Sequence, residues 1–268
     1  MRTRLLHVLA VAGLAAGLAA AEATAAGPTP GFSQPGVISP DGKLRYVAVP
    51  RGATTFVKAV RFSDGRMLRH TTLRGVWGVP LVAFDGTAEG VTRDGKRLLL
   101  ETEAGRAITR FAFLSTKTLK VLQSFSLRGT WAYDAMSADA QTVYLIQLLA
   151  STDSIRYLVR AYDVSARRLV AGAIADKREP GAMTGFPLSR AVSKDGTWAY
   201  TLYQRSNAEP FIHALNTRDR VAICIDIDWK GDRNNLGLVQ LTLSADETQL
   251  LIRSGATGTT VMTVPAPH

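Results

Sequence analysis

Hydrophobic residues along this chain come in short runs, and polar turns separate the runs at nearly regular intervals. After residue 26 the runs are rich in Val, Ile, Leu, Tyr, Phe and Thr, and Gly, Asp, Asn, Ser or Pro borders each of them. Runs of about 5–10 residues with those borders are typical of β-strands joined by tight turns. No stretch beyond residue 26 carries an apolar stripe at helical spacing. The pattern therefore predicts an all-β protein.

Two kinds of turn repeat along the chain. The first kind has the pattern Ser/Thr-x-Asp, with first-residue spacings of 53, 45, 56 and 51, and its members begin at Ser39, Thr92, Ser137, Ser193 and Ser244. The second kind recurs at spacings of 52, 50 and 51, at Ser63, Ser115, Ser165 and Asn216. A period of about 50 residues indicates an array of repeated units and not one irregular core.

Each of the first four repeats offers four strand-like runs, joined by links short enough for an antiparallel meander. Meanders repeated every ~50 residues predict a β-propeller of about five four-stranded antiparallel blades. The fifth repeat offers only three runs, at 238–244, 249–253 and 259–264, so we expect the last blade to be incomplete. Residues 27–36 contain three prolines and would pair poorly with it, which leaves the closure of the ring open.

Two of the repeats have a more particular pattern. Ser39-Pro-Asp-Gly-Lys-Leu-Arg-Tyr-Val47 and Ser193-Lys-Asp-Gly-Thr-Trp-Ala-Tyr200 each join a turn to a second strand that carries an aromatic residue. These segments resemble the YVTN-type and WD-repeat-like propellers of secreted bacterial proteins. The resemblance covers about residues 37–264 and implies the fold without implying an activity. Such families usually have more blades, which implies either a small five-bladed ring or an incomplete one.

The first 26 residues have the features of a secretory signal peptide. Arg2 and Arg4 precede an apolar segment at 5–21, and a small-x-small pattern follows at Ala23-Thr24-Ala25. We expect cleavage to leave a Pro/Gly-rich linker at 27–36 and a propeller domain at 37–268. An uncleaved anchor is the alternative, although the apolar segment is short for a membrane span. The expected location is outside the cell or at its envelope, with no transmembrane segment after cleavage.

The charge of the chain points to anionic partners. Loss of the signal peptide lowers the formal net charge from +10 to +9. An exported basic protein meets anionic cell-envelope polymers, so we expect such a polymer or a protein partner; a merely solvated basic surface is the alternative. The basic residues form no polybasic run, which argues against specific nucleic-acid binding.

Cys224, the only cysteine, has apolar neighbours and is expected to be a small core residue. We expect the protein to be a monomer.

A first candidate site lies in the predicted inner strands. Glu89, Asp134 and Arg190 each stand three residues before the Ser or Thr that opens a turn. Inner strands line the central channel of a propeller, so these charges are expected to converge at its mouth as a ligand-binding site. The alternative is an ion pair between blades or solvation at the rim.

A second candidate site is aromatic. The motif Leu-Arg-Gly-x-Trp ends at Trp77 and again at Trp131, and Trp229 ends a later outer strand. All three stand where one blade crosses to the next, which is one face of a propeller. Exposed there, they would suit sugar rings or peptides, whereas buried they would pack adjacent blades together.

The chain lacks the usual signatures of catalysis. The acidic segment Asp226–Asn235 fails the EF-hand pattern and is interpreted as a plain acidic turn. His70, His213 and His268 have no metal-binding spacing, and His213 is expected to be a core or inter-blade residue. We therefore expect no catalytic residue, metal or cofactor, and favour a non-catalytic binding or scaffold module. The alternative is a channel-site hydrolase or lactonase that begins with Glu89 and Asp134.

Overall fold

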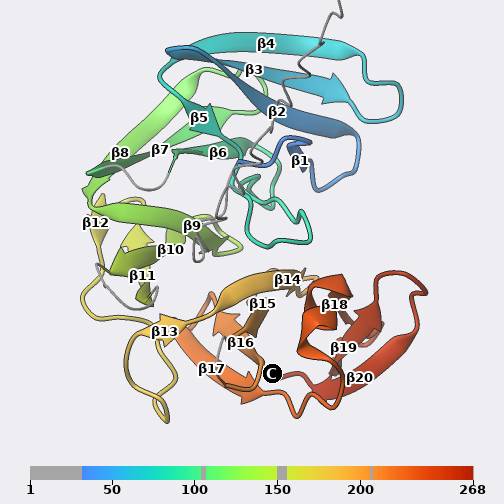
Figure 1. The fold of residues 1–268 in the computed structure, drawn as a ribbon. Helices are drawn as coiled ribbons and strands as arrows, with labels where there is room; N and C mark the ends of the chain where they lie inside the picture. The colour runs from blue at the N-terminus through green and yellow to red at the C-terminus, as the bar shows by residue number, and fades with distance from the viewer. Residues whose placement is uncertain (1–31, 104–106, 150–155, 206–207, 268) are drawn as a thin grey trace, which may run out of the picture.

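A computed structural model describes residues 32–103, 107–149, 156–205 and 208–267, which form five antiparallel sheets arranged around a centre (Figure 1). We call the sheets blades 1 to 5 in chain order. The sheets confirm the predicted all-β propeller of about five blades with an incomplete last blade. No helix in these four ranges is long and apolar enough to cross a membrane.

Three of the blades have four strands. Blade 1 contains β1 (Val37–Ile38), β2 (Leu44–Arg51), β3 (Thr54–Arg61) and β4 (Met67–Arg74). Blade 2 contains β5 (Trp77–Gly78), β6 (Arg97–Thr102), β7 (Ile108–Ser115) and β8 (Val121–Arg128). Blade 4 contains β14 (Phe186–Val192), β15 (Trp198–Gln204), β16 (Phe211–Asn216) and β17 (Val221–Asp226).

The other two blades depart from four strands. Blade 3 contains β9 (Thr130–Met136), β10 (Thr142–Leu149), β11 (Arg156–Asp163) and β12 (Arg168–Leu169), and β13 (Met183–Thr184) also pairs with β11. Blade 5 has only β18 (Val239–Leu243), β19 (Gln249–Ser254) and β20 (Thr260–Pro265). A short 3₁₀ helix, η1 (Arg233–Leu238), links blades 4 and 5.

The five Ser/Thr-x-Asp turns share one set of hydrogen bonds. In blade 4, Ser193 Oγ donates to Asp195 Oδ1 at 2.7 Å and accepts from the backbone N of Trp198 at 2.9 Å. The same two bonds recur in the other turns, which open at Ser39, Thr92, Ser137 and Ser244. Hydrogen bonds from Thr197 and Ser193 lower the pKa of Asp195 to about 2. The turns that reveal the repeat in the sequence are thus also the rigid corners of the fold.

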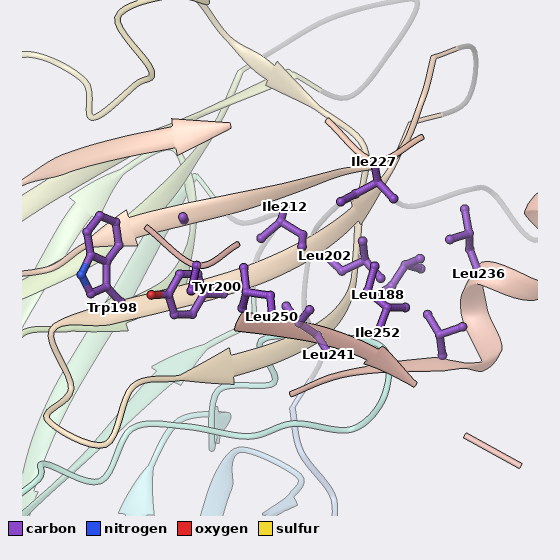
Figure 2. Close-up of a cluster of buried hydrophobic side chains, with 13 residues drawn as sticks. Leu188, Trp198, Tyr200, Leu202, Ile212, Ile227, Leu236, Leu241, Leu250 and Ile252 are labelled. Atoms are coloured by element: carbon purple, nitrogen blue, oxygen red, sulfur yellow. The ribbon is translucent and has the colours of Figure 1, made fainter. Parts of the chain in front are cut away.

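Apolar clusters join consecutive blades. Buried side chains connect blade 1 to 2, 2 to 3, 3 to 4 and 4 to 5. Figure 2 shows the cluster between blades 4 and 5, where Leu202 and Ile212 meet Leu241, Leu250 and Ile252. In the ranges that the structure describes, no such cluster joins blade 5 to blade 1. Each of these two blades therefore has one face without a neighbouring blade.

The inner strand of blade 2 differs from the prediction. Glu89 was expected on the inner strand of this blade, but the structure has β5 at Trp77–Gly78 and only an isolated bridge from Val91 to Leu98 near Glu89. Between these two pairings the chain leaves the sheet and forms a loop at 81–88, closed by a bridge from Leu81 to Ala88. We call this segment the channel loop.

The channel loop joins blade 2 to blade 4 across the centre. The backbone N of Phe84 donates to Pro187 O, and that of Asp85 to Leu188 O, both at 3.0 Å. Ser189 Oγ donates to Asp85 Oδ2 at 2.6 Å. The loop thus reaches the strand β14 and ties together two blades that are not neighbours in the ring.

The turn between β3 and β4 of blade 1 and the equivalent turn between β11 and β12 of blade 3 each contain a residue with a positive φ, which provides a test of the local structure. Arg167 has a φ of 55° in blade 3, and glycine takes the corresponding place in blade 1, where Gly65 has a φ of 70°. We expect Arg167→Gly to raise the free energy of unfolding by about 1 kcal/mol, because a side chain at positive φ is strained. The one described hydrogen bond of Arg167 goes to Ser124 O at the surface and should offset little of this gain.

Gly65→Ala is the matched control for Arg167→Gly. A Cβ at Gly65 would meet no atom within 4 Å, so any loss of stability would be purely conformational. Urea denaturation should show the two variants shifted in opposite directions. If the Arg167→Gly variant were no more stable than the native protein, the backbone of Arg167 would not be strained as its positive φ indicates.

Candidate functional site

The three charges predicted at the channel mouth do come together. Arg190 on β14 places Nη2 2.7 Å from Asp134 Oδ1 on β9, and Nε 3.6 Å from Glu89 Oε1 just after the channel loop. Tyr133 OH donates to Glu89 Oε2 at 3.2 Å. Blades 2, 3 and 4 thus each contribute one charged side chain to a single cluster.

Burial divides these three residues into two roles. The side chains of Arg190 and Asp134 are 1% and 2% exposed, whereas that of Glu89 is 20% exposed. Arg190 and Asp134 therefore form the inter-blade ion pair that was the alternative to a ligand site. Burial works against the charge on Arg190, but Glu89 and Asp134 raise its pKa above the ordinary value. The guanidinium stays charged, and the two carboxyl groups beside it neutralise that charge.

A pocket of about 410 Å³ opens above this cluster, on the face that carries the Ser/Thr-x-Asp turns. We call it the turn-face pocket. Its polar residues are Thr87, Glu89, Arg93, Tyr133, Ser137 and Arg190. The pocket is otherwise largely apolar, and its apolar walls comprise Val37, Ile38, Val91, Met136 and Val192. Burial raises the pKa of Glu89, with Arg190 opposing the shift. Glu89 is thus the member of the cluster whose side chain remains partly exposed, although its Oε1 atom is buried.

A polar row continues from the cluster across blade 4. Arg190 is the cross-strand partner of Thr201, which in turn pairs with His213, so the three side chains share one face of the sheet. His213 is 1% exposed, which confirms the expected core or inter-blade position, and burial lowers its pKa. Within the described ranges, Thr201 Oγ1 and His213 Nε2 have no hydrogen-bond partner.

Sequence reasoning missed Glu101 and Tyr133. Glu101 on β6 is 2% exposed, and its Oε2 accepts from the backbone N of Tyr133 at 2.8 Å, which links blades 2 and 3. Burial raises the pKa of Glu101 to about 8. The available signal was a carboxyl directly after the apolar run 98–100. Tyr133 carries no such signal, because a tyrosine in an apolar strand is an ordinary core residue.

The tryptophans of the junctions serve packing. Trp131 is 3% exposed between blades 2 and 3, which at this position is the packing alternative and not the exposed one. Trp77 and Trp229 are half-buried against the clusters of blades 1–2 and 4–5. The indole Nε1 of Trp77 donates to Arg74 O, and that of Trp131 to Arg128 O, both at 2.8 Å. The repeated motif therefore anchors the crossing from one blade to the next.

Two other predicted features have structural roles. In the acidic segment, the Asp232 side chain accepts from the backbone N of Asn234 and caps η1, while Lys230 pairs with Asp228. Cys224 on β17 is only half-buried, so it is less enclosed than expected. Its backbone N donates to Asp176 Oδ2 at 2.8 Å.

The net charge of the propeller domain is concentrated in its first two blades. Residues 37–75 hold eight Lys and Arg against two Asp, a net charge of +6, and residues 76–128 add +3. Acidic and basic residues balance over 129–268. The two aspartates of blade 1, Asp41 and Asp64, lie in turns and not in strands. Counting charges blade by blade would have shown this asymmetry from the sequence.

Blade 1 presents many of its charges on the face away from blade 2. Arg45 is opposite Val60 and Lys58 is opposite Val47, whereas the alternate residues of both strands pack on blade 2. The guanidinium of Arg45 stacks on Phe62 at 4.8 Å, and that of Arg51 on Phe56 at 4.6 Å. The ion pairs found among the described residues include none of these three cations. We call Arg45, Arg51, Lys58, Phe56 and Phe62 the basic face.

Comparisons with known proteins show the fold and no family. No protein-family model matches the sequence, and no curated protein does. Hydrazine synthase of Kuenenia stuttgartiensis has a similar structure, with a TM-score of 0.56 and 13% identity over 85% of this chain and 70% of that chain. TolB from Acinetobacter baumannii has a TM-score of 0.47 and 14% identity, over 89% of this chain. The Dos1 propeller has a TM-score of 0.45 and 11% identity, over 86% of this chain.

This chain spans 55% of the TolB chain and 57% of the Dos1 chain. The five sheets of this chain form a β-propeller fold. Fold alone assigns no function, because propellers serve many.

The buried carboxyl of Glu101 leads to a prediction about pH. Its pKa in the folded state, about 8, exceeds the ordinary value of 4.5, so the unfolded chain loses this proton first as the pH rises. The contribution of Glu101 to stability is therefore complete below about pH 4 and is lost toward pH 8. Glu101→Gln keeps an acceptor for Tyr133 N and cannot ionise. We expect it to raise the free energy of unfolding at pH 8 by about 2–4 kcal/mol.

Denaturation curves from pH 4 to pH 8 measure this effect. The native protein should lose stability over that range more steeply than Glu101→Gln. Glu103→Gln, at an exposed position two residues on, is the control and should leave the pH profile unchanged. Equal stability of the native protein and Glu101→Gln at pH 8 would refute the prediction.

Proposed function

We propose that this chain is an exported, non-catalytic β-propeller binding module that holds an anionic polymer of the cell envelope on its basic face. The observation that carries the proposal is the charge of blade 1, +6 with only two carboxylates, both in turns. Export rests on the signal peptide predicted at residues 1–26, which lie outside the described residues.

The basic face has the electrostatics that such a ligand needs. Charges of one sign on one surface create an attractive potential for polyanions, because no carboxylate on the strands of blade 1 cancels it. Stacking on Phe62 and Phe56 holds the guanidinium groups of Arg45 and Arg51 in place. Less side-chain entropy is then lost when these groups bind sulfate, phosphate or carboxylate.

The shape of the face favours a linear ligand. Arg45 and Arg51 lie at opposite ends of β2, with Lys58 on the neighbouring strand β3 between them. An extended polymer lying along β2 would meet the three cations in succession. The channel mouth is less suited to an anion, because Arg190 is already neutralised by Asp134.

Heparin is a suitable probe of this proposal. We expect the native protein to bind heparin with an affinity that falls steeply between 50 mM and 300 mM salt, because exposed charges are screened within about 8 Å at physiological ionic strength. The variant Arg45→Gln/Arg51→Gln/Lys58→Gln should bind at least about tenfold more weakly, equivalent to about 1.4 kcal/mol.

A charge-matched control separates this face from the net charge. The variant Arg156→Gln/Arg168→Gln/Lys177→Gln also removes three positive charges, but from exposed positions outside blades 1 and 2. It should change heparin affinity by less than about threefold. Equal losses in the two triple variants would indicate diffuse attraction only. Absence of binding by the native protein would reject the polymer and leave a protein partner as the alternative.

A further inference from the structure

We propose that the turn-face pocket is a second binding site, for a small ligand that presents an ammonium group from an apolar stem. The basic face attracts anions, so this site would select ligands of the opposite charge. The inference rests on the groups around Glu89 and is independent of the function proposed for blade 1.

The charges below the pocket favour a cation. Two carboxyl groups, Glu89 and Asp134, surround the single guanidinium of Arg190. Asp134 Oδ1 lies 2.7 Å from Nη2 of Arg190, whereas Glu89 Oε1 lies 3.6 Å from its Nε. An ionised Glu89 therefore leaves one negative charge in excess, next to the pocket. An ammonium ion would neutralise it, whereas a carboxylate would add to it.

Unpartnered polar atoms mark the same place. Within the described ranges, Glu89 Oε1 and Asp134 Oδ2 are buried without a hydrogen-bond partner, and as acceptors they can take hydrogen bonds from an ammonium group. The Nε and Nη1 donors of Arg190 also lack a hydrogen bond; Nε faces Glu89 Oε1 at 3.6 Å, and Nη1 needs an acceptor such as water. Native proteins rarely leave such atoms unsatisfied, so groups of this kind point to a ligand or an ordered water. The side chain of Arg190 is 1% exposed and lines the pocket, which places these atoms at its deep end.

The remaining walls suit an apolar stem. Val37, Val91 and Met136 line the sides, and Ile38 and Val192 stand at 42% and 44% exposure. A volume of about 410 Å³ is within the range of small-molecule sites. Arg93 adds a positive charge to the lining, but it is exposed, so solvent screens it more than Glu89.

A pair of ligands that differ only in the charged group tests the proposal. n-Pentylamine and pentanoate share one stem, and their binding to the native protein can be followed by chemical-shift titration at pH 7. We expect pentylamine to bind at least about tenfold more tightly than pentanoate. Pentanoate binding as tight as pentylamine, or no binding of either, would overturn the proposal.

Variants then locate the binding. Glu89→Gln should lower the affinity for pentylamine about tenfold, while Glu209→Gln, at an exposed position in blade 4, should leave it unchanged. Ile38→Trp fills the pocket from an exposed position and should abolish binding even if Glu89→Gln proves unstable. Pentylamine binding that survives Ile38→Trp would place the ligand elsewhere and refute the site. Heparin binding should be unaffected by Glu89→Gln, so the two proposals fail separately.

Discussion

The buried ion pair between Arg190 and Asp134 determines what the centre of this propeller can do. One partner comes from blade 4 and the other from blade 3, and neither side chain is more than 2% exposed. Removal of one partner would leave an unpaired charge in a dry environment, which costs about 3–5 kcal/mol. The strongest charges of the channel therefore serve the assembly of the blades. The two groups proposed for recognition, Glu89 and the basic face, lie outside this pair.

A second constraint is that each blade has two faces to cover. Blades 2, 3 and 4 pack apolar side chains on both sides, and the channel loop also fixes blade 2 to blade 4 through Asp85 and Ser189. Among the described residues, blade 1 packs against another blade on one side only, which is the side of blade 2. On its other side, the guanidinium groups of Arg45 and Arg51 stack on Phe62 and Phe56. Long basic side chains can pack on apolar surface while their charges stay in water, and this arrangement is the one proposed above to attract anions.

Most of the fold could be predicted because the repeated turns depend on hydrogen bonds between residues close in the sequence. A side chain such as Ser193 bonds to Asp195 two residues away, so the turn forms wherever these residue types recur. The inner strand of blade 2 was predicted wrongly because its chain leaves the sheet. The partners of the channel loop, Pro187 and Leu188, are about 100 residues away in the sequence, so no local pattern could predict these contacts.

The candidate site was predicted in part for a similar reason. Repeat position alone brought Glu89, Asp134 and Arg190 together, because equivalent inner-strand positions converge on the channel. Their burial depends on how blades 3 and 4 pack, which the sequence does not state. Charge could be counted for each blade, but the register of β2 against β3 was needed to assign Arg45 and Lys58 to one face.

A double-mutant cycle on Arg190 and Asp134 tests the central claim most directly. Chemical denaturation would give the free energies of unfolding of Arg190→Met, Asp134→Leu and the double variant. A structural pair predicts a loss of about 3–5 kcal/mol for each single variant and a smaller loss for the double variant than the two single losses together, because the double variant removes both charges of the pair at once. Single losses within about 0.5 kcal/mol that simply add would contradict the account, because they would place both charges in solvent, free for a ligand.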